Sequence, residues 1–411
     1  MARRLGALAE RNFRLVFTSA TISALGDGVS TIALAFAVLQ ISNSPSALGA
    51  VIAARQVASA GITVAAGVWA DRLPRHLVLV TAATVQGAMQ AISGALVLSG
   101  HASVSALAGL ALVFGFADGF VIPASQGLIP TIVSTARLQQ ANALLGLSRS
   151  ILGVAGPALG GVLVALGSPG AALLVDAATF AVAAALLVRL SIAPRSDVAE
   201  PRPFLHELRE GWSEFRRQTW IWTTIVFFGI GNFAGASYYV LGPLVAKREL
   251  GGAPAWATIV SAFGVGSILG GLLALRLRPR RPLLASCVAA IPYGTTTLAI
   301  GLGLPLPALV AVSTIAGIGI AIHLALWFTV FQQQVPEAAR SRVSSYDALG
   351  SFVLIPLGAA LAGPVASVIG VSATLIASGA LSLICIAIVI AQPSVWAIAD
   401  QTQAAVAEPW R

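Results

Sequence analysis

The sequence predicts an all-α integral membrane protein of twelve transmembrane helices in two six-helix halves. The first observation is its composition: 57% of the 411 residues are apolar and only 9% are charged, with a mean hydropathy of +0.89. Soluble chains carry about a quarter charged residues. The second observation is a series of long apolar runs, and the third is that the basic residues lie in the gaps between these runs. Because the basic residues lie in short gaps, the net charge of +9 does not indicate a nucleic-acid binder.

Each apolar run is long enough to cross a bilayer, which takes about 20 helical residues. The first run follows a basic N-terminus but is too long for a signal-peptide core, so we expect it to remain as a helix. The predicted spans are 15–40, 47–70, 77–99, 104–129, 141–166, 170–191, 219–246, 255–276, 283–303, 308–333, 343–368 and 371–391.

The charge between the spans predicts the orientation. With the N-terminus in the cytoplasm, the inner segments and helix ends hold 21 of the 24 Lys and Arg residues, as the positive-inside rule requires. Both termini are therefore expected in the cytoplasm, in a multi-pass protein of the cell (inner or plasma) membrane. The expected parts are a first half (1–191), a linker with an amphipathic helix from Phe204 onward (192–218), a second half (219–391) and a tail (392–411).

The two halves resemble each other in sequence. Residues 129–167 contain Ile-Pro, an arginine, Ala-Asn-Ala-Leu and a Gly/Ala-rich helix, and residues 335–370 repeat the pattern with Val-Pro, Arg340 and Tyr-Asp-Ala-Leu. Two similar halves around a midplane site are how many secondary transporters alternate access. The repeat therefore favours a transporter over a channel or a membrane enzyme.

Between the second and third spans stands Gly67-Val-Trp-Ala-Asp71-Arg72-Leu-Pro-Arg75-His. This stretch resembles the loop signature of the major facilitator superfamily, Gly-x-x-x-Asp-Arg-x-Gly-Arg-Arg/Lys, with Pro74 in place of a glycine and His76 in place of a fixed cation. The resemblance implies that Gly67, Asp71, Arg72 and Arg75 form a latch that closes the cytoplasmic side. A purely topogenic cluster explains the arginines but not the glycine and the acid at this spacing.

The fifth span carries Gly153-Val-Ala-Gly156-Pro157-Ala-Leu-Gly160-Gly161. It resembles the Gly-x-x-x-Gly-Pro-x-x-Gly-Gly signature of the superfamily's exporters, with its first glycine one residue closer. Gly156 and Gly160 also form a small-xxx-small face for close helix packing, and Pro157 permits a bend. The stretch is therefore either an exporter motif or a packing motif alone.

The resemblance covers the whole chain and extends to prokaryotic exporters of the enterobactin- and macrolide-efflux type. The residues that carry it are Arg11-Asn-Phe-Arg14, Gly26-Asp27, Gln140-Ala-Asn-Ala-Leu144 and Gly156-Pro157. In one respect the chain departs from many drug/proton antiporters, which hold a buried arginine in the fourth span. Here that span has Asp118 instead, so a coupling scheme built on the arginine does not transfer.

The charges at membrane depth that most need an explanation are Asp27, Arg55 and Asp118, since such a charge costs about 2.5–3.5 kcal/mol and usually faces a cavity or a partner. Asp27 and Asp118 fall near the middle of the first and fourth spans, which line the central cavity in the fold that the resemblance implies. They are the candidates for proton coupling or for pairing with a cationic substrate, whereas a structural pair or a helix kink is the alternative. Arg55 can pair with Asp27 or extend toward lipid headgroups. Asp176 and Asp347 are expected to be structural, Asp347 at the start of the eleventh span, where the helix dipole favours an acid.

The second half has polar and aromatic candidates for a substrate cavity. Asn232 and Tyr239 are seven residues apart, and His323 and Trp327 are four apart, so each pair shares a helix face. Amide and aromatic groups suit an amphipathic organic substrate. Alternatively, the tyrosines form an interfacial belt and Trp327 packs in the core.

We therefore expect a monomeric, proton-coupled exporter of small amphipathic molecules such as drugs, siderophores or metabolites, with a nutrient importer of the same fold as the alternative. The proton gradient is the expected energy source, without a cofactor or a metal: the four histidines are scattered, and Cys287 and Cys385 lie far apart. An enzyme is not expected, because the sequence has no nucleophile–base pair and no phosphate-binding loop.

Overall fold

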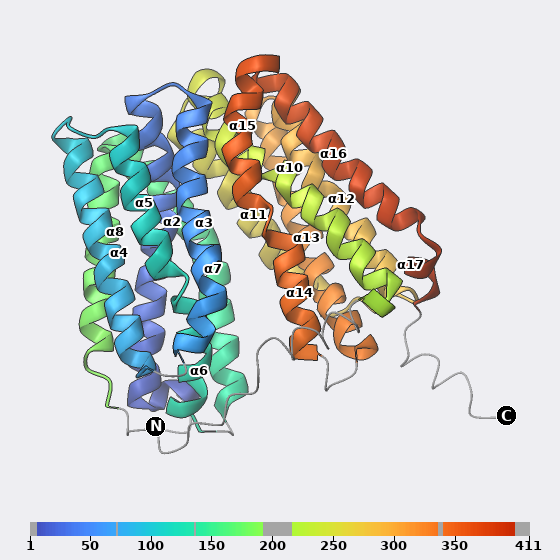
Figure 1. The fold of residues 1–411 in the computed structure, drawn as a ribbon, viewed down its shortest axis with the longest axis horizontal. Coiled ribbons are helices and arrows are strands. Elements are labelled where there is room, and N and C mark those ends of the chain that lie inside the picture. The colour runs from blue at the N-terminus through green and yellow to red at the C-terminus, as the bar shows by residue number, and fades with distance from the viewer. Residues whose placement is uncertain (1–5, 71–72, 135–136, 192–215, 336–339, 399–411) are drawn as a thin grey trace. The chain divides into compact units, whose positions relative to one another are not determined.

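The computed structural model describes residues 6–70, 73–134, 137–191, 216–335 and 340–398, and every regular element in these ranges is a helix (Figure 1). A helix or a pair of helices coincides with each of the twelve predicted ranges. Those of the first half are α2 (Arg11–Ile41), α3 (Pro45–Ala70), α4 (Arg75–Leu98), α5 (Val104–Asp118), α6 (Val121–Ile132), α7 (Leu138–Leu166) and α8 (Pro169–Leu187), preceded by the 3-10 turn η1 (Gly6–Ala9).

The second half begins with the helices α10 (Thr219–Glu249), α11 (Ala253–Ala274) and α12 (Pro282–Gly301). They are followed by α13 (Leu306–Gln334), α14 (Arg340–Phe352), α15 (Ile355–Ile369), α16 (Val371–Ala391) and the short α17 (Pro393–Ala397). The linker, with the amphipathic segment predicted from Phe204 onward, and the end of the tail lie outside the described residues. The predicted division into halves, linker and tail stays a prediction.

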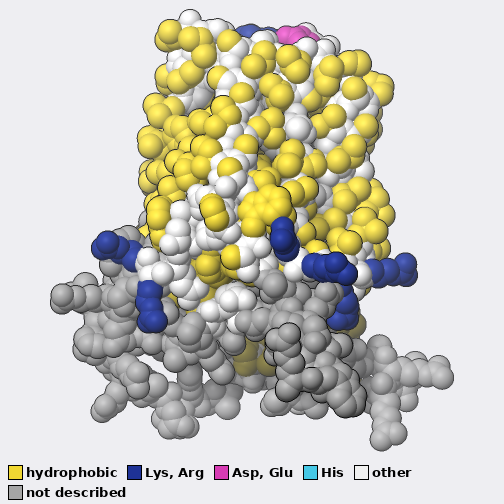
Figure 2. Space-filling view, turned by 90° about the vertical axis from the view of Figure 1, so that its right-hand side faces the viewer, with side chains coloured by type: hydrophobic (Ala, Val, Ile, Leu, Met, Phe, Trp, Pro, Cys, Tyr) yellow, Lys and Arg dark blue, Asp and Glu magenta, His cyan; other side chains and the backbone are white. Residues whose placement is uncertain are grey.

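Eleven of the described helical segments are long and apolar enough to cross a membrane. They match eleven of the twelve predicted spans, and α3 is the helix at the remaining range, 47–70. The exposed surface fits this role, since many large apolar side chains point outward, among them Leu166, Val368 and Leu275 at 77–86% exposure. Hydrophobic side chains cover most of the face in Figure 2, and Lys and Arg side chains lie near its lower edge. Twelve spans and cytoplasmic termini remain the expectation.

Local sequence signals explain several helix starts. Ser103 and Ser168 cap α5 and α8, where their hydroxyl oxygens accept hydrogen bonds from Ala106 N at 3.2 Å and Ala171 N at 3.1 Å. Such caps satisfy backbone donors that have no partner inside the helix. Proline occupies the first turn of α8, α12, α13 and α15, where its missing N–H costs nothing.

Two of the predicted spans are interrupted. The fourth is divided between α5 and α6, since α5 ends at Asp118 and α6 starts at Val121. The eleventh is divided between α14 and α15, with a turn at Val353 and Leu354. Discontinuous helices are tolerated in a membrane where neighbouring protein satisfies the freed backbone groups. The first interruption places Asp118 at a helix end.

The chain divides into two compact units, residues 1–199 with 243–261, and residues 200–242 with 262–411. In the first unit α2 packs against α7 and α8, α3 against α5, and α4 against α8. In the second unit α12 packs against α13 and α16. Glycines allow the closest approaches, because a Cβ at Gly94 would lie 2.8 Å from Gly170 O and one at Gly379 would lie 2.7 Å from Leu298 N. Small residues at helix contacts are the expected way to pack helices in lipid.

Candidate functional site

Asp27 forms an ion pair inside the first unit. Arg55 on α3 donates through Nη2 to Asp27 Oδ1 on α2 at 3.4 Å. The guanidinium also lies over the ring of Phe114, 4.1 Å from its centroid, in cation–π geometry. The side chains of Asp27 and Arg55 are 39% and 25% exposed. Of the two roles predicted for Arg55, the structure shows the pair with Asp27.

The residues on either side of Asp27 are glycines that touch two other helices. A Cβ on Gly28 would lie 2.7 Å from the Cα of Gly156 on α7. A Cβ on Gly26 would overlap the side chains of Asp176 and Thr179 on α8. The stretch Gly26-Asp27-Gly28 therefore brings three helices to one point. The two glycines allow α7 and α8 to approach α2 closely, and the Asp27 carboxylate between them contacts Arg55 on α3.

Asp118 is held by neutral donors. Ser59 Oγ on α3 donates to Asp118 Oδ2 at 3.1 Å, and Gln86 Nε2 on α4 donates to Asp118 Oδ1 at 3.3 Å. The carboxylate is partly buried at the break between α5 and α6. Both oxygens are hydrogen-bonded, yet neither donor carries a charge. Among the described residues, Asp118 therefore has hydrogen bonds but no ion-pair partner.

Asp176 is fully buried on α8. Its Oδ2 accepts from Gln90 Nε2 at 2.5 Å, and its Oδ1 accepts from Thr179 Oγ1 at 3.3 Å. These bonds fit the structural role expected from the sequence. Gln86 and Gln90 are one turn apart on α4, and each reaches a different carboxylate. One face of α4 therefore links Asp118 to Asp176.

These contacts join three carboxylates and one guanidinium in the first unit, a set that we call the acid cluster (Asp27, Asp118, Asp176 and Arg55). Among the residues that the structure describes, only Asp27 of the three acids has an ion-pair partner. The excess of carboxylates over cations suits the binding of protons or of a cationic molecule. Asp27, Asp118 and Arg55 were predicted, whereas Gln86, Gln90 and Ser59 were not. The sequence signal that could have identified Gln86 and Gln90 was their spacing of four residues on a hydrophobic helix.

Of the predicted latch, the structure describes only part. Gly67 lies in α3, and Asp71 and Arg72 lie outside the described residues. Arg75 starts α4 and donates through Nη1 to Gly127 O on α6 at 2.5 Å. A side chain at Gly127 would occupy the space of this guanidinium. Arg75 therefore ties the start of α4 to the second part of the broken fourth span.

The exporter-type motif on α7 is a contact surface, but not at every position. A Cβ on Gly156 would lie 2.8 Å from the Cα of Gly28, and one on Gly160 would lie 2.8 Å from Val29 O. Gly161 packs against Ala257 of the same compact unit, and Pro157 is buried inside the helix. Gly153 has nothing within 4 Å of its Cβ position. The motif therefore packs α7 against α2 beside Asp27, without a steric need for its first glycine.

In the second unit, one of the predicted cavity residues contacts Asp347 and another contacts Ser351, a neighbour of Asp347 in the same hydrogen-bonded group. Trp327 Nε1 donates to Asp347 Oδ2 at 3.0 Å, and Ser351 Oγ donates to Asp347 Oδ1 at 3.2 Å. Asn232 Nδ2 donates to Ser351 O at 2.9 Å. The prediction that Asp347 starts its helix is wrong, because Asp347 lies two turns into α14. Its carboxylate is satisfied by side-chain donors rather than by a helix N-terminus.

The other two candidates lie in different surroundings. His323 is buried, stacks on Phe228 with ring centroids 4.7 Å apart, and places Nδ1 2.9 Å from Ser286 Oγ. Tyr239 is 42% exposed and packs edge-to-face on Tyr238, with ring centroids 5.0 Å apart. In the described structure these two side chains belong to a core contact and to an aromatic pair, apart from the Asp347 group.

Long apolar helices that hold three carboxylates and one arginine within one unit are typical of a membrane transporter rather than of an enzyme. The model of the Major Facilitator Superfamily matches residues 16–353. The chain belongs to this superfamily, as its loop signature predicted. A curated relative, the uncharacterized MFS-type transporter YvqJ of Bacillus subtilis (strain 168), is 21% identical over 269 residues, which is 64% of each chain.

Solved structures show the same fold. A bacterial homologue of the human lysosomal transporter Spinster, inward-facing and unoccupied, aligns with a TM-score of 0.72 at 16% identity, over 93% of this chain and 96% of that one. The nucleoside transporter NupG aligns with a TM-score of 0.70 at 15% identity, over 92% and 98%. A bacterial homologue of the iron transporter ferroportin gives 0.68 at 15% identity, over 93% and 99%. These likenesses establish the fold.

Proposed function

We propose that this protein is a proton-coupled exporter of small amphipathic molecules such as drugs, siderophores or metabolites. It acts as a monomer in the cell membrane, with the proton gradient as its energy source and no cofactor. The observation that carries the proposal is the acid cluster, in which one of three carboxylates at membrane depth pairs with an arginine and the other two accept only from neutral donors. A transporter has use for such an excess of acids because each can take up and release a proton.

Asp27 is the acid best placed to couple a proton to movement. When Asp27 is ionised it holds Arg55 at 3.4 Å; when a proton binds Asp27, the attraction between the two side chains is lost. Arg55 can then turn to another carboxylate or to an anionic part of the substrate. Asp118 is the second candidate, because its two donors are neutral and leave its charge available to a proton.

The direction of transport is proposed from the motif on α7. Gly156 contacts Gly28, next to Asp27, and Pro157 permits α7 to bend at that point. A bend in α7 would therefore displace α2, the helix that carries Asp27. The motif resembles that of exporters of the enterobactin- and macrolide-efflux type, which favours outward transport of related amphipathic molecules. Asn232, His323, Trp327 and Tyr239 remain candidates for substrate contact.

Inside-out vesicles acidified on the inside test this proposal. With ethidium, a macrolide antibiotic and a catecholate siderophore as probes, we expect at least one to accumulate, and to leak out when an uncoupler collapses the gradient. The variant Asp27→Asn keeps an oxygen that can accept from Arg55 but cannot carry the proton. It should fold and lose gradient-driven accumulation.

The matched control is Glu10→Gln, the same change in a carboxylate that pairs with Arg137 at 3.4 Å near the chain's start. It should retain wild-type accumulation. Accumulation that survives the uncoupler would contradict proton coupling, and a fully active Asp27→Asn would assign Asp27 a structural role. Gradient-driven uptake by intact cells would identify the protein as an importer.

A further inference from the structure

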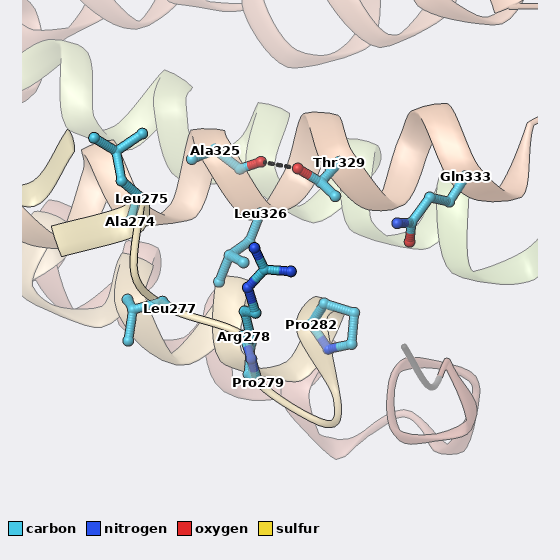
Figure 3. Close-up of a pocket in the computed structure, with 10 residues that line it drawn as sticks. All are labelled: Ala274, Leu275, Leu277, Arg278, Pro279, Pro282, Ala325, Leu326, Thr329 and Gln333. Carbon is cyan, nitrogen blue, oxygen red and sulfur yellow. Dashed lines mark hydrogen bonds between the residues drawn. The ribbon is translucent and has the colours of Figure 1, made fainter. Parts of the chain in front are cut away.

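A pocket of about 200 Å³ opens at one end of the second unit. It lies between the connection that joins α11 to α12 and the last turns of α13 (Figure 3). Its polar groups are Arg278 from the connection and Thr329 and Gln333 from α13, one turn apart. Its apolar wall includes Leu277, Pro282 and Leu326. The lining therefore combines one cation, two uncharged polar groups and hydrocarbon.

The charge of Arg278 is directed at this pocket. In Figure 3 its guanidinium points from the connection toward α13. Among the described residues, Arg278 has no carboxylate within ion-pair distance. Its neighbour Arg281 is engaged elsewhere, 5.3 Å above the ring of Trp396. Thr329 already donates its hydroxyl hydrogen to Ala325 O at 2.7 Å, so its oxygen can only accept. The pocket thus offers donors from Arg278 and Gln333 and an acceptor from Thr329.

The position of the pocket relates it to the membrane surface. α11 and α12 are both long and apolar enough to span the bilayer, so the connection between them lies where a span meets water. Four arginines stand in this connection, at positions 276, 278, 280 and 281. Beside it, Leu272 and Leu275 are 58% and 77% exposed. A ligand here meets a cation at one end and lipid-facing hydrocarbon at the other.

We propose that this pocket binds the headgroup of an anionic phospholipid, with the phosphate on Arg278. A guanidinium matches a phosphate because it donates two parallel hydrogen bonds, and basic pockets near helix ends bind acidic headgroups. The amide of Gln333 adds a further donor to the phosphate. A hydroxyl of a glycerol headgroup can donate to Thr329 Oγ1, and the acyl chains lie along the exposed side chains of Leu272 and Leu275. This site is independent of the proposed direction of transport.

Binding is measured with the purified full chain in detergent, by native mass spectrometry with dioleoylphosphatidylglycerol and with dioleoylphosphatidylcholine. We expect retention of the anionic lipid over the zwitterionic one. The variant Arg278→Gln should weaken retention of phosphatidylglycerol by about tenfold, since a hydrogen bond to a charged group is lost. Ala325→Phe, which fills the pocket without a change of charge, should weaken it by a similar factor. Arg276→Gln is the control, because it removes a charge from the same connection but not from the pocket lining.

Retention that falls equally in Arg276→Gln would mean diffuse attraction to the basic connection and would overturn the proposal. The same conclusion follows if the two lipids are retained alike. Displacement of the lipid by 10 mM inorganic phosphate would identify a free anion as the occupant. If Arg278→Gln does not fold, as judged from its melting temperature, the retention of phosphatidylglycerol by Ala325→Phe tests the proposal by itself.

Discussion

The contact between α2 and α7 beside Asp27 predicts the effect of a single methyl group. In Gly156→Ala the added Cβ would lie 2.8 Å from the Cα of Gly28 and 3.2 Å from Leu25 O. Carbon atoms in contact prefer about 3.5–4.0 Å, so the two helices must separate by about 0.7–1.2 Å. Both close neighbours are backbone atoms, which cannot move aside as the end of a flexible side chain can.

Overpacking of this kind typically costs about 1–3 kcal/mol. Alanine also has a better helix propensity than glycine, worth about 0.5–1 kcal/mol in the opposite direction. The matched variant Gly153→Ala has the same gain in helix propensity, since it makes the same change in the same helix at a site where nothing lies within 4 Å of the added Cβ. The difference between the two variants is therefore the steric cost alone, about 1–3 kcal/mol.

The assay is thermal unfolding of the purified protein in detergent, followed by tryptophan fluorescence. For a unit of this size the cost corresponds to a melting temperature roughly 2–12 °C lower in Gly156→Ala than in Gly153→Ala. Gly153→Ala itself should melt at or slightly above the wild-type temperature. If both variants melt together, or if Gly153→Ala is the less stable one, the close contact of α7 with α2 is refuted.

Two further contacts give predictions of the same kind. Gly127→Ala displaces the Arg75 guanidinium from the carbonyl oxygen of residue 127. Loss of this hydrogen bond should cost about 0.5–1.5 kcal/mol of stability. The melting temperature should therefore be lower than that of the control Gly146→Ala, where the added methyl group meets open space. Trp327→Phe removes the donor to Asp347 and should cost about 1–3 kcal/mol in the same assay, whereas Trp222→Phe at a 37% exposed site should change little. Equal melting temperatures within either pair of variants would contradict the corresponding contact.

The positions of the helices could be predicted from the sequence because they depend on one property, the apolar length needed to cross a bilayer. For example, the predicted spans 371–391 and 283–303 compare with observed helices at 371–391 and 282–301. The break in the fourth span has a local cause, since Gly119 and Pro123 weaken the helix there. In the eleventh span Gly350 and Pro356 stand on either side of the turn at Val353 and Leu354, a signal that the prediction of one continuous helix over 343–368 missed.

The candidate site was predictable only in part, because a single sequence gives the depth of a residue but not which helices face each other. Asp27 and Arg55 could be paired from depth and charge alone. Asp347 was expected at a helix start, and its real partners Trp327 and Ser351 depend on a contact between α13 and α14 that no local pattern encodes. The link from Gln86 and Gln90 to two acids on different helices was missed for the same reason.

Packing and charge in the acid cluster depend on each other. The glycines on either side of Asp27 let α7 and α8 approach α2 closely, while the Asp27 side chain itself stays 39% exposed and pairs with Arg55 on α3. Asp118 and Asp176 receive only neutral donors, so the single guanidinium cannot satisfy all three acids at once. Under the proposed proton coupling, a proton on one acid would change where Arg55 is needed most, and the close contacts at Gly26 and Gly28 would transmit that change to α7 and α8.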